Sequence, residues 1–271
     1  MKDHKMADLS SVDLREILGV SPAGNDTYTS NSFLPRARTI DGGQIAGQAL
    51  NAALDGVDIE FEAHSIHASF IAAGDSTKPV QYLVTRDRDG RSFATRHVTA
   101  FQGDVLIFRM FASFQKVEDG DDVQILPIPD TPGPENSPQS MAKLIGFDIR
   151  DPYPVQAAGK VTSAWAKPVI TLGNDPRWNA SALIYLSDMF NGLPDLLDFP
   201  NDSFQTSLDH ALWLHRPFVL DDWLMFTHLG KTLASGRSLF TGEYFNSAGV
   251  HVATSAQEML YRPPRVSHAT S

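Results

Sequence analysis

The spacing of apolar residues predicts two helices near the start of the chain. Residues 10–19, SSVDLREILG, are typical of a short helix, because Ser10 and Asp13 resemble a capping box and Gly19 suits the helix end. Residues 41–54, DGGQIAGQALNAAL, combine small and apolar residues, with no acid after Asp41. This composition indicates a second helix that packs closely against a sheet.

Alternating apolar and polar residues predict four long strands after these helices. The segments are HSIHASFI at 64–71, PVQYLVTRDR at 79–88, SFATRHVTAFQ at 92–102 and VLIFRMFASFQK at 105–116. Asp89-Gly90 and Gly103-Asp104 suit the turns between the last three segments. A helix followed by an antiparallel meander indicates a sheet wrapped around a helix.

The second half of the chain repeats this pattern after an interruption. Residues 117–140 hold six acids and five prolines, which predicts a stiff acidic linker. A helix of the buried type at about 180–197 then precedes strands at 206–218, 222–233, 236–246 and 251–262. HASF at 67–70 aligns with HRPF at 215–218, so the sequence indicates two copies of one fold.

One acid interrupts the apolar pattern of the second-half helix. The stretch ALIYLSDMFNGL, residues 182–193, is apolar on almost every side and carries Asp188 near its middle. An ionised carboxylate in such a place costs several kcal/mol unless other groups hold it. Asp188 is therefore either a chemical group of the site or a structural residue that bonds to nearby backbone.

Composition excludes several classes of protein and site. The chain of 271 residues has no cysteine, which excludes disulfides, thiolate metal ligands and a cysteine nucleophile and is consistent with the cytosol. No apolar run reaches the roughly 18 residues of a membrane span, and the N-terminus lacks the apolar core of a signal peptide. The formal charge of −10 argues against a nucleic-acid binder. We therefore expect a cytoplasmic protein with neither a membrane nor a nucleic-acid partner.

The polar residues of the last strands offer candidate chemistry. Ser207 and Asp209 share one face of a predicted strand, and Gln257 shares a face with Ser255 and Met259. A glutamine amide does not titrate, so Gln257 orients a water molecule but does not act as a base. Each residue alone is equally well explained as a polar strand position.

Metal, nucleotide and serine-hydrolase sites are not predicted. The sequence contains no GxSxG elbow, P-loop or GxGxxG motif. His64 and His67 are three residues apart on a strand and therefore point to opposite faces. His210 and His215 have the same difficulty, so we expect neither a metal nor another cofactor.

With these residues in place, the sequence resembles the type II acyl-CoA thioesterases, the family of bacterial thioesterase II and the peroxisomal acyl-CoA thioesterases. The resemblance covers most of the chain outside the tails and the linker. Its segments are GGQIAGQAL (42–50), HSIHASFIAAGDSTKPVQYLV (64–84), RDGRSFATRHVTAFQ (88–102), ASFQ (112–115), YLSDM (185–189), LDHALWLHRPF (208–218), DDWL (221–224), GEYF (242–245) and VATSAQE (252–258).

The resemblance implies an α+β fold with two hotdog units in tandem, each a curved antiparallel sheet wrapped around a long central helix. It implies an N-terminal hotdog domain at 1–118, the acidic linker at 119–145 and a C-terminal hotdog domain at 146–271 that carries the catalytic set. It also implies a homo-oligomer.

The same resemblance assigns the catalytic set to Asp188, Ser207 and Gln257. Asp188 would be the general base for a water that attacks the thioester of a fatty acyl-CoA, and Ser207 and Gln257 would orient that water. Two departures from the family stand out: Ser207 replaces the common threonine, and Asp41 replaces phenylalanine in the usual FGGQ. The glycines after Asp41 are where we expect donors for the oxyanion.

Three alternatives remain open at this point. The protein is a non-catalytic acyl-CoA binding hotdog protein, a hotdog enoyl-CoA hydratase, or a thioesterase that forms an acyl-enzyme through Asp188. The first would not need the complete catalytic set, and the second lacks its DxNPxH loop here. Other residues have expected contacts that core packing or solvation explain equally well: Met189, Phe190 and Trp213 with the acyl chain, and Arg86, Arg88, Arg91 and Arg237 with the CoA phosphates.

Overall fold

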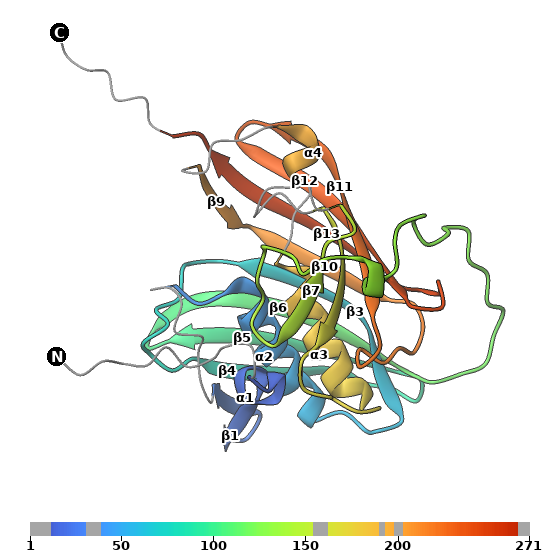
Figure 1. Cartoon of the computed structure of the whole chain (residues 1–271). Helices are drawn as coiled ribbons and strands as arrows, with labels where there is room; N and C mark the ends of the chain where they lie inside the picture. Colours follow the sequence, from blue (N-terminus) through green and yellow to red (C-terminus); the bar gives the residue numbers. More distant parts are fainter. Residues whose placement is uncertain (1–11, 31–38, 154–161, 190–192, 198–202, 265–271) are drawn as a thin grey trace, which may run out of the picture.

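One antiparallel sheet organises the chain, with a small layer of helices on one face (Figure 1). The computed structural model describes residues 12–30, 39–153, 162–189, 193–197 and 203–264. The helices are α1 (Leu14–Leu18), α2 (Gly42–Asp55), α3 (Pro176–Ser187) and α4 (Leu193–Leu196), with a 3-10 turn at Pro134–Asn136. The strands are β1 (Val20–Gly24), β2 (Thr27–Ser30), β3 (Phe61–Phe70), β4 (Gln81–Asp89), β5 (Phe93–Gln102), β6 (Val105–Lys116), β7 (Phe147–Arg150), β8 (Ser163–Pro168), β9 (Phe204–Ser207), β10 (Asp209–Leu214), β11 (Leu224–Ala234), β12 (Arg237–Asn246) and β13 (His251–Arg262).

The strand order shows that the two halves of the chain are built alike. The order across the sheet is β1-β2-β4-β5-β6-β3-β10-β13-β12-β11-β8-β7, and β9 pairs with β13. Outwards from the junction of β3 and β10, the first half reads β3-β6-β5-β4-β2-β1 and the second reads β10-β13-β12-β11-β8-β7. Each half therefore places its elements in the same sequence, as the repeated pattern of the chain predicts.

The predicted strands of both halves are present, but two details of the repeat are wrong. HASF lies inside β3, whereas HRPF at 215–218 follows the end of β10, so these segments are not equivalent positions. The strand predicted at 206–218 is divided at Leu208 into β9 and β10. The backbone of Leu208 bonds to the two strands on either side. Its N–H donates to the carbonyl of Glu258 in β13, and its carbonyl accepts from the N–H of Phe70 in β3.

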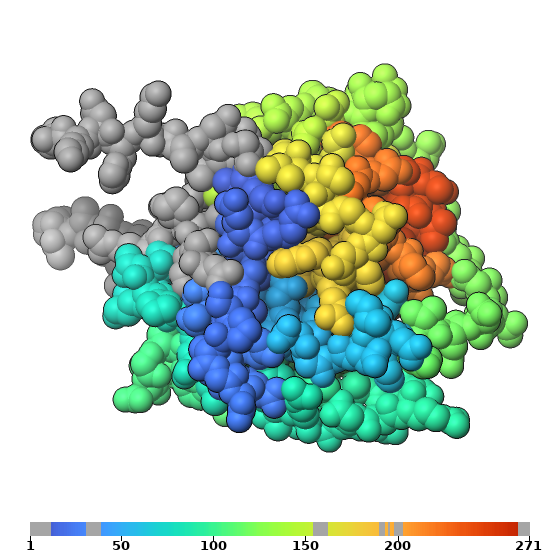
Figure 2. Space-filling model, turned by 90° about the horizontal axis from the view of Figure 1, so that it is seen from below, coloured from blue at the N-terminus to red at the C-terminus, as the bar shows by residue number. Residues whose placement is uncertain are grey.

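Helices α2 and α3 pack against each other beside the sheet. α2 also lies against β4, β5 and β6, and α3 lies against β3. Each helix begins at an aspartate, Asp41 for α2 and Asp175 for α3, whose side chain accepts a backbone N–H of the first turn. On the face seen in Figure 2, the yellow segment that holds α3 lies beside the blue N-terminal part of the chain.

Glycines set the distance between these two helices. A Cβ atom at Gly43 would lie 2.5 Å from the carbonyl oxygen of Tyr185, and one at Gly47 would lie 3.0 Å from that of Ser181. Both contacts are with backbone of α3, which cannot move aside as a flexible side chain can. The close packing predicted from the small residues of 41–54 is therefore a helix-helix contact as well as a helix-sheet contact.

The second-half helix is shorter than predicted. The pattern of residues 180–197 suggested one helix, but α3 ends at Ser187 and α4 is a separate turn. α4 lies against β11 and β12. Met189 and Leu193 therefore pack in the apolar core outside a continuous helix.

The acidic segment between the halves is tied to the second half. Residues 117–133 form no helix or strand and run along the outside of the molecule in Figure 1. The side chain of Gln124 donates to the carbonyl of Gly249 at 2.9 Å and accepts from the N–H of His251 at 2.8 Å. Arg216 also pairs with Asp122.

Among the residues described, every helix is too short or too polar to span a bilayer.

The contact at Gly43 leads to a stability prediction. We expect Gly43→Ala to lower the free energy of unfolding by about 1–3 kcal/mol, because the new methyl group overpacks the backbone of Tyr185. Gly120→Ala is the matched control, since no heavy atom lies within 4 Å of a Cβ at that position. Urea denaturation followed by circular dichroism measures both, and equal midpoints for the two variants would contradict the prediction.

Candidate active site

Three side chains from distant parts of the second half meet at one carboxylate oxygen. The hydroxyl of Ser207 donates to Oδ1 of Asp188 at 3.0 Å. Nε2 of Gln257 donates to the same oxygen at 2.8 Å and lies 2.6 Å from Oγ of Ser207. The structure thus brings together all three residues that the sequence singled out.

Asp188 lies at the end of its helix, which corrects its predicted place in the middle. It is the C-cap residue of α3, with φ −85° and ψ −12°. The carbonyl end of a helix carries partial negative charge and does not favour a carboxylate. Other groups must therefore stabilise the ionised form of Asp188.

The start of α2 supplies part of that stabilisation. A Cβ atom at Gly42 would lie 2.5 Å from Oδ2 of Asp188, so the backbone of the first half approaches the carboxylate closely. The backbone N–H of Gly43 forms a hydrogen bond with Asp188. The positive end of α2 thus faces the acid at the end of α3, and both halves contribute to the site.

The environment of Asp188 shifts its pKa upwards. Burial raises the pKa from 3.8 to about 7, and the negative charge of Asp41 adds to this rise. Hydrogen bonds from Ser207, Gln257 and the backbone of Gly43 lower the pKa but do not outweigh burial. The carboxyl group is therefore close to half ionised near neutral pH, as a general base requires.

Asp41, which departs from the family pattern, has an identifiable structural role. Its carboxylate accepts from the N–H of Gln44 at 3.0 Å and so caps α2. Its charge also raises the pKa of Asp188. The substitution thus changes the charge at the entrance of α2 without breaking the helix start.

Ser207 reaches the site because β9 ends there. β9 pairs with β13, with Ser207 opposite Met259. Asp209, which was expected on the same face, is exposed and accepts from the N–H of Glu258 at 2.8 Å. Asp209 is therefore outside the set that contacts Asp188.

A buried histidine contacts the site and was not assigned a role from the sequence. Nδ1 of His210 lies 2.7 Å from Oε1 of Gln257, and Nε2 lies 2.7 Å from Oγ of Ser187. Burial lowers the pKa of His210 to about 4, so the ring is neutral at pH 7. The sequence signal for this role was the position of His210 two residues before Leu212, which places both side chains on the buried face of the strand. A buried imidazole needs polar partners.

The predicted substrate-lining residues separate in the structure. Met189 packs against the apolar core. Trp213 is exposed on the sheet face opposite His210 and contacts His67 edge-on at 5.3 Å, so it does not line the site. Phe190 lies outside the described residues.

The four arginines expected near the CoA phosphates do not form one cluster. Arg86 is on β4 and Arg237 on β12, with five strands between them in the sheet. Arg86 pairs with Asp26 and Arg237 with Glu258. Arg86 and Arg237 are therefore on strands that are not neighbours, and each has an acid as its partner.

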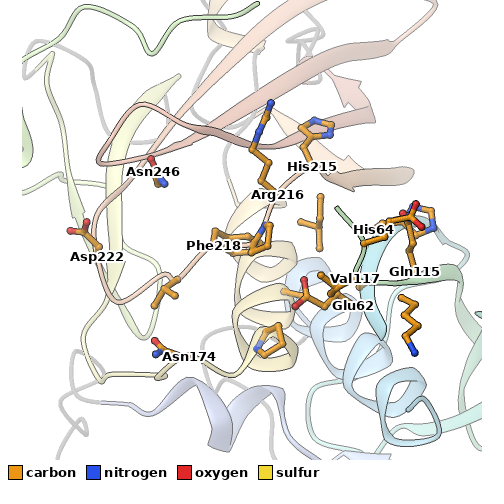
Figure 3. Close-up of a pocket in the computed structure, with 18 residues that line it drawn as sticks. Glu62, His64, Gln115, Val117, Asn174, His215, Arg216, Phe218, Asp222 and Asn246 are labelled. Carbon is orange, nitrogen blue, oxygen red and sulfur yellow. The ribbon is translucent and has the colours of Figure 1, made fainter. Parts of the chain in front are cut away.

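A groove of about 560 Å³ opens at the opposite end of α3 (Figure 3). Its walls come from both halves, with Glu62 and His64 on one side and His215 and Arg216 on the other. The groove reaches Pro176 at the start of α3, and a helix of this length spans about 18 Å. The residues around Asp188 do not line this groove.

Among the described residues, no group of three or more His, Asp or Glu is arranged to hold a metal ion.

Comparison with known proteins identifies the family of the chain. The profile of the acyl-CoA thioesterase N-terminal domain matches residues 33–115, and that of the C-terminal domain matches residues 121–261. The chain is 32% identical to acyl-coenzyme A thioesterase 8 of Rattus norvegicus, over 97% of this chain and 93% of that protein. It is 29% identical to acyl-CoA thioesterase 2 of Haemophilus influenzae, over 83% of this chain and 88% of that protein.

Solved structures show the same relationship. Acyl-CoA thioesterase II TesB2 from Mycobacterium marinum matches with a TM-score of 0.78 and 32% identity, over 93% of this chain and 98% of that chain. A hot dog fold protein of unknown function from Alicyclobacillus acidocaldarius matches with a TM-score of 0.80 at 17% identity, which shows the fold alone. With two family profiles that together span most of its length and a relative of 32% identity, this chain belongs to the type II acyl-CoA thioesterase family and has a hotdog fold.

Proposed function

We propose that this protein hydrolyses fatty acyl-CoA to free fatty acid and CoA, with Asp188 as the general base. The observation that carries the proposal is the convergence of Ser207 and Gln257 on Oδ1 of an acid whose pKa is about 7. A base with this pKa accepts a proton at neutral pH and is strong enough to activate water. The family relationship supports the thioester as substrate.

The proposed reaction proceeds by direct attack of water. Asp188 takes a proton from the water while the water oxygen bonds to the thioester carbonyl carbon. The tetrahedral intermediate collapses, the carbon-sulfur bond breaks, and the leaving thiolate of CoA accepts the proton from Asp188. Ser207 and Gln257 orient the water, so the attack is close to intramolecular. In this scheme the carboxylate of Asp188 activates the water, and no cofactor takes part.

The Gly42-Gly43 segment has a more specific role in this proposal than supplying oxyanion donors. The N–H of Gly43 bonds to Asp188 and therefore stabilises the ionised base. The positive end of α2 also favours negative charge that develops beside it.

The alternatives receive less support. A pure acyl-CoA binder has no need for an acid with a raised pKa and two polar side chains bonded to it. An enoyl-CoA hydratase would need an acid and a histidine that both reach the substrate, whereas His210 lies behind Gln257.

We further propose two hotdog domains in tandem, at residues 1–118 and 146–271, with the acidic linker at 119–145 between them. The matching order of strands in the two halves supports this division. The packing of α2 on β4–β6 supports a sheet wrapped around a helix in the first half. The cytosolic location that the cysteine-free composition favours stays a prediction.

We also propose that the protein assembles with copies of itself through the outer face of the sheet. Phe111 is 51% exposed and Trp213 is 36% exposed on this face. The ring of His97 stacks on Phe111 at 4.4 Å, and in the strand register Phe111 lies between His97 and His67. An exposed row of aromatic rings across several strands is typical of a protein-protein interface.

Removal of the base provides the first test of the proposed reaction. We expect Asp188→Asn to lower kcat for palmitoyl-CoA by about 10²–10⁴-fold, because an amide accepts no proton from water. Ser207→Ala and Gln257→Ala should each lose about 10²–10³-fold. Thiol release measures turnover, and calorimetry with a non-hydrolysable thioether analogue should show that Asp188→Asn still binds.

The matched control is Asp209→Asn. This exposed acid lies two residues from Ser207 but does not contact Asp188, and asparagine keeps an oxygen for the N–H of Glu258. Its turnover should equal that of the wild type. Wild-type turnover by Asp188→Asn would refute the assignment of the base.

The pH dependence of the reaction tests the state of Asp188. Since the base must be ionised, kcat/KM should rise with pH through a midpoint at about 7 and level off above it. Ser207→Ala removes a hydrogen bond that lowers the pKa of Asp188, so its residual activity should show a higher midpoint. Loss of thioester absorbance measures both profiles, and a wild-type midpoint near 4 would contradict the predicted environment.

The outer face gives a prediction for the assembly. We expect Phe111→Glu to convert the wild-type oligomer into smaller species, because it places a charge in the middle of the aromatic row. Ile59→Glu is the control, since Ile59 is 68% exposed in the turn between α2 and β3. Sedimentation velocity measures the mass of each. A monomeric wild type, or an unchanged mass for Phe111→Glu, would be evidence against this interface.

A further inference from the structure

The proposed reaction leaves one buried polar residue of the site without a role. His210 is 1% exposed and lies between Gln257 and Ser187, at 2.7 Å from each. It has no contact with Asp188, because Gln257 lies between them. Its hydrogen bonds lead towards the acid by two routes, through the amide of Gln257 and through Ser187, the residue before Asp188.

The hydrogen bonds fix the direction of that amide from the carboxylate outwards. An ionised carboxylate only accepts hydrogen bonds, so Gln257 must present its NH₂ group to Oδ1 of Asp188. The amide oxygen Oε1 then faces Nδ1 of His210 at 2.7 Å. Since Oε1 carries no hydrogen, Nδ1 of His210 must donate.

The opposite side of the ring fixes which nitrogen carries the proton. In a neutral imidazole with its hydrogen on Nδ1, Nε2 is an acceptor. The hydroxyl of Ser187 lies 2.7 Å from Nε2 and 3.1 Å from the carbonyl oxygen of Ile184, so with the ring proton on Nδ1 its one hydrogen is shared between these two acceptors. Ser187 belongs to the last turn of α3, directly before Asp188. The chain of donors thus runs from Ser187 through His210 and Gln257 to the acid.

The first half of the chain shows that the fold does not need this polar pair. Across the junction, His210 pairs with Ala68 and Leu212 pairs with Ile66, so the buried positions of β10 face buried apolar positions of β3. Each of these four residues is buried.

The next strands continue this comparison. In the first half Ile66 pairs with Ala112. In the second half Ala211 of β10 pairs with Ala256 of β13. Because the strands are antiparallel, the residue before Ala211, His210, lies opposite the residue after Ala256, Gln257. The buried pairs of β3 and β6, Ile66 with Ala112 and Ala68 with Met110, are therefore apolar, whereas β10 and β13 bury an imidazole and an amide.

We propose that His210, held as the Nδ1–H tautomer by Ser187, is the positioning residue that keeps the NH₂ group of Gln257 directed at Asp188 and Ser207. This inference rests on the proposed function, because its consequence is the orientation of the water and the ionisation of the base. Without a donor at Nδ1, the amide is free to turn its oxygen towards Asp188. Two acceptors would then face each other, which favours the protonated carboxyl.

The other charged and titratable groups around the pair do not replace this donor. Asp41, at the start of α2, raises the pKa of Asp188. His228 lies near His210, and burial lowers its pKa to about 3, so it is neutral. Tyr244 bonds to His228, Ser255 and Ser187, and burial raises its pKa. At neutral pH the ionising group of this cluster is therefore Asp188.

Two substitutions of His210 separate positioning from simple packing. In His210→Asn the side-chain NH₂ takes the place of Nδ1–H, whereas in His210→Gln the amide reaches only the place of Nε2. We expect His210→Asn to keep kcat within about fivefold of the wild type, with an unchanged pH midpoint. We expect His210→Gln to lose about 10²-fold in kcat, as on removal of one aimed donor, with its pH midpoint raised by about one unit and little change in KM.

Equal losses in both variants, or a wild-type pH midpoint in His210→Gln, would overturn the proposal. Circular dichroism and melting temperatures show whether each variant is folded. The double variant His210→Ile, Gln257→Ala reproduces the apolar pair of the first half, and it should fold with its base present and its kcat reduced at least about 10²-fold.

A spectroscopic measurement tests the tautomer independently of activity. Long-range ¹H–¹⁵N correlation spectra of wild-type protein labelled at its histidines distinguish Nδ1–H from Nε2–H rings, and His210→Asn identifies the signals of His210. We expect the Nδ1–H form between pH 6 and pH 8. An Nε2–H ring would overturn the inference even if the protein hydrolyses acyl-CoA. A wild type without thioesterase activity would instead refute the proposed function and leave this spectrum as the test of the tautomer.

Discussion

The contact between the start of α2 and the end of α3 is the constraint on which the site depends. It brings the backbone N–H of Gly43, from the first half, to the carboxylate of Asp188, from the second. The approach is permitted by residues without side chains, because a methyl group at Gly42 would meet Asp188 and one at Gly43 would meet Tyr185. The small residues of α2 therefore determine both how the helices pack and how the acid is held.

Two opposing effects act on that acid, and their balance sets its chemistry. Burial favours the neutral form, and three hydrogen bonds favour the ionised form. Because the folded-state pKa is about 7 and the ordinary value is 3.8, ionisation of Asp188 destabilises the fold as pH rises through that interval. The protein thus holds a group that is less stable in its active form, which is common at catalytic sites.

The strands β1, β2, β7 and β8 were not predicted. The strands β3–β6 and β10–β13 were readable from sequence because buried positions alternate with more exposed ones along much of their length. In β5, for example, Ala94, Arg96, Val98 and Ala100 are buried in strict alternation. The end of α3 was not readable, because Met189 continues the apolar pattern after the helix stops at Ser187. The pattern of apolar residues along a segment indicates which side chains are buried. It does not indicate the backbone conformation at which a helix ends.

The site was predictable only in part, for a related reason. Asp188, Ser207 and Gln257 were found through motifs, and their spacing in space follows from the pairing of β9 and β10 with β13. The role of His210 depends on which residue lies opposite it on β13, and this register is not written in either segment alone. From sequence, Asp41 was only a departure from the family pattern. The structure shows that its side chain caps α2 and that its charge acts on Asp188.

The two halves of the chain are held together in two ways, by the hydrogen-bonded junction of β3 and β10 and by the covalent link through residues 117–133. A cut within residues 117–133 would give two fragments. The second would contain Asp188, and the first would contain the backbone N–H of Gly43 that stabilises its ionised form. Each fragment would also expose an unpaired strand edge, β3 on one and β10 on the other. Pairing of these edges and packing of α2 on α3 would bring the two parts of the site together again, so we expect the two fragments to complement each other.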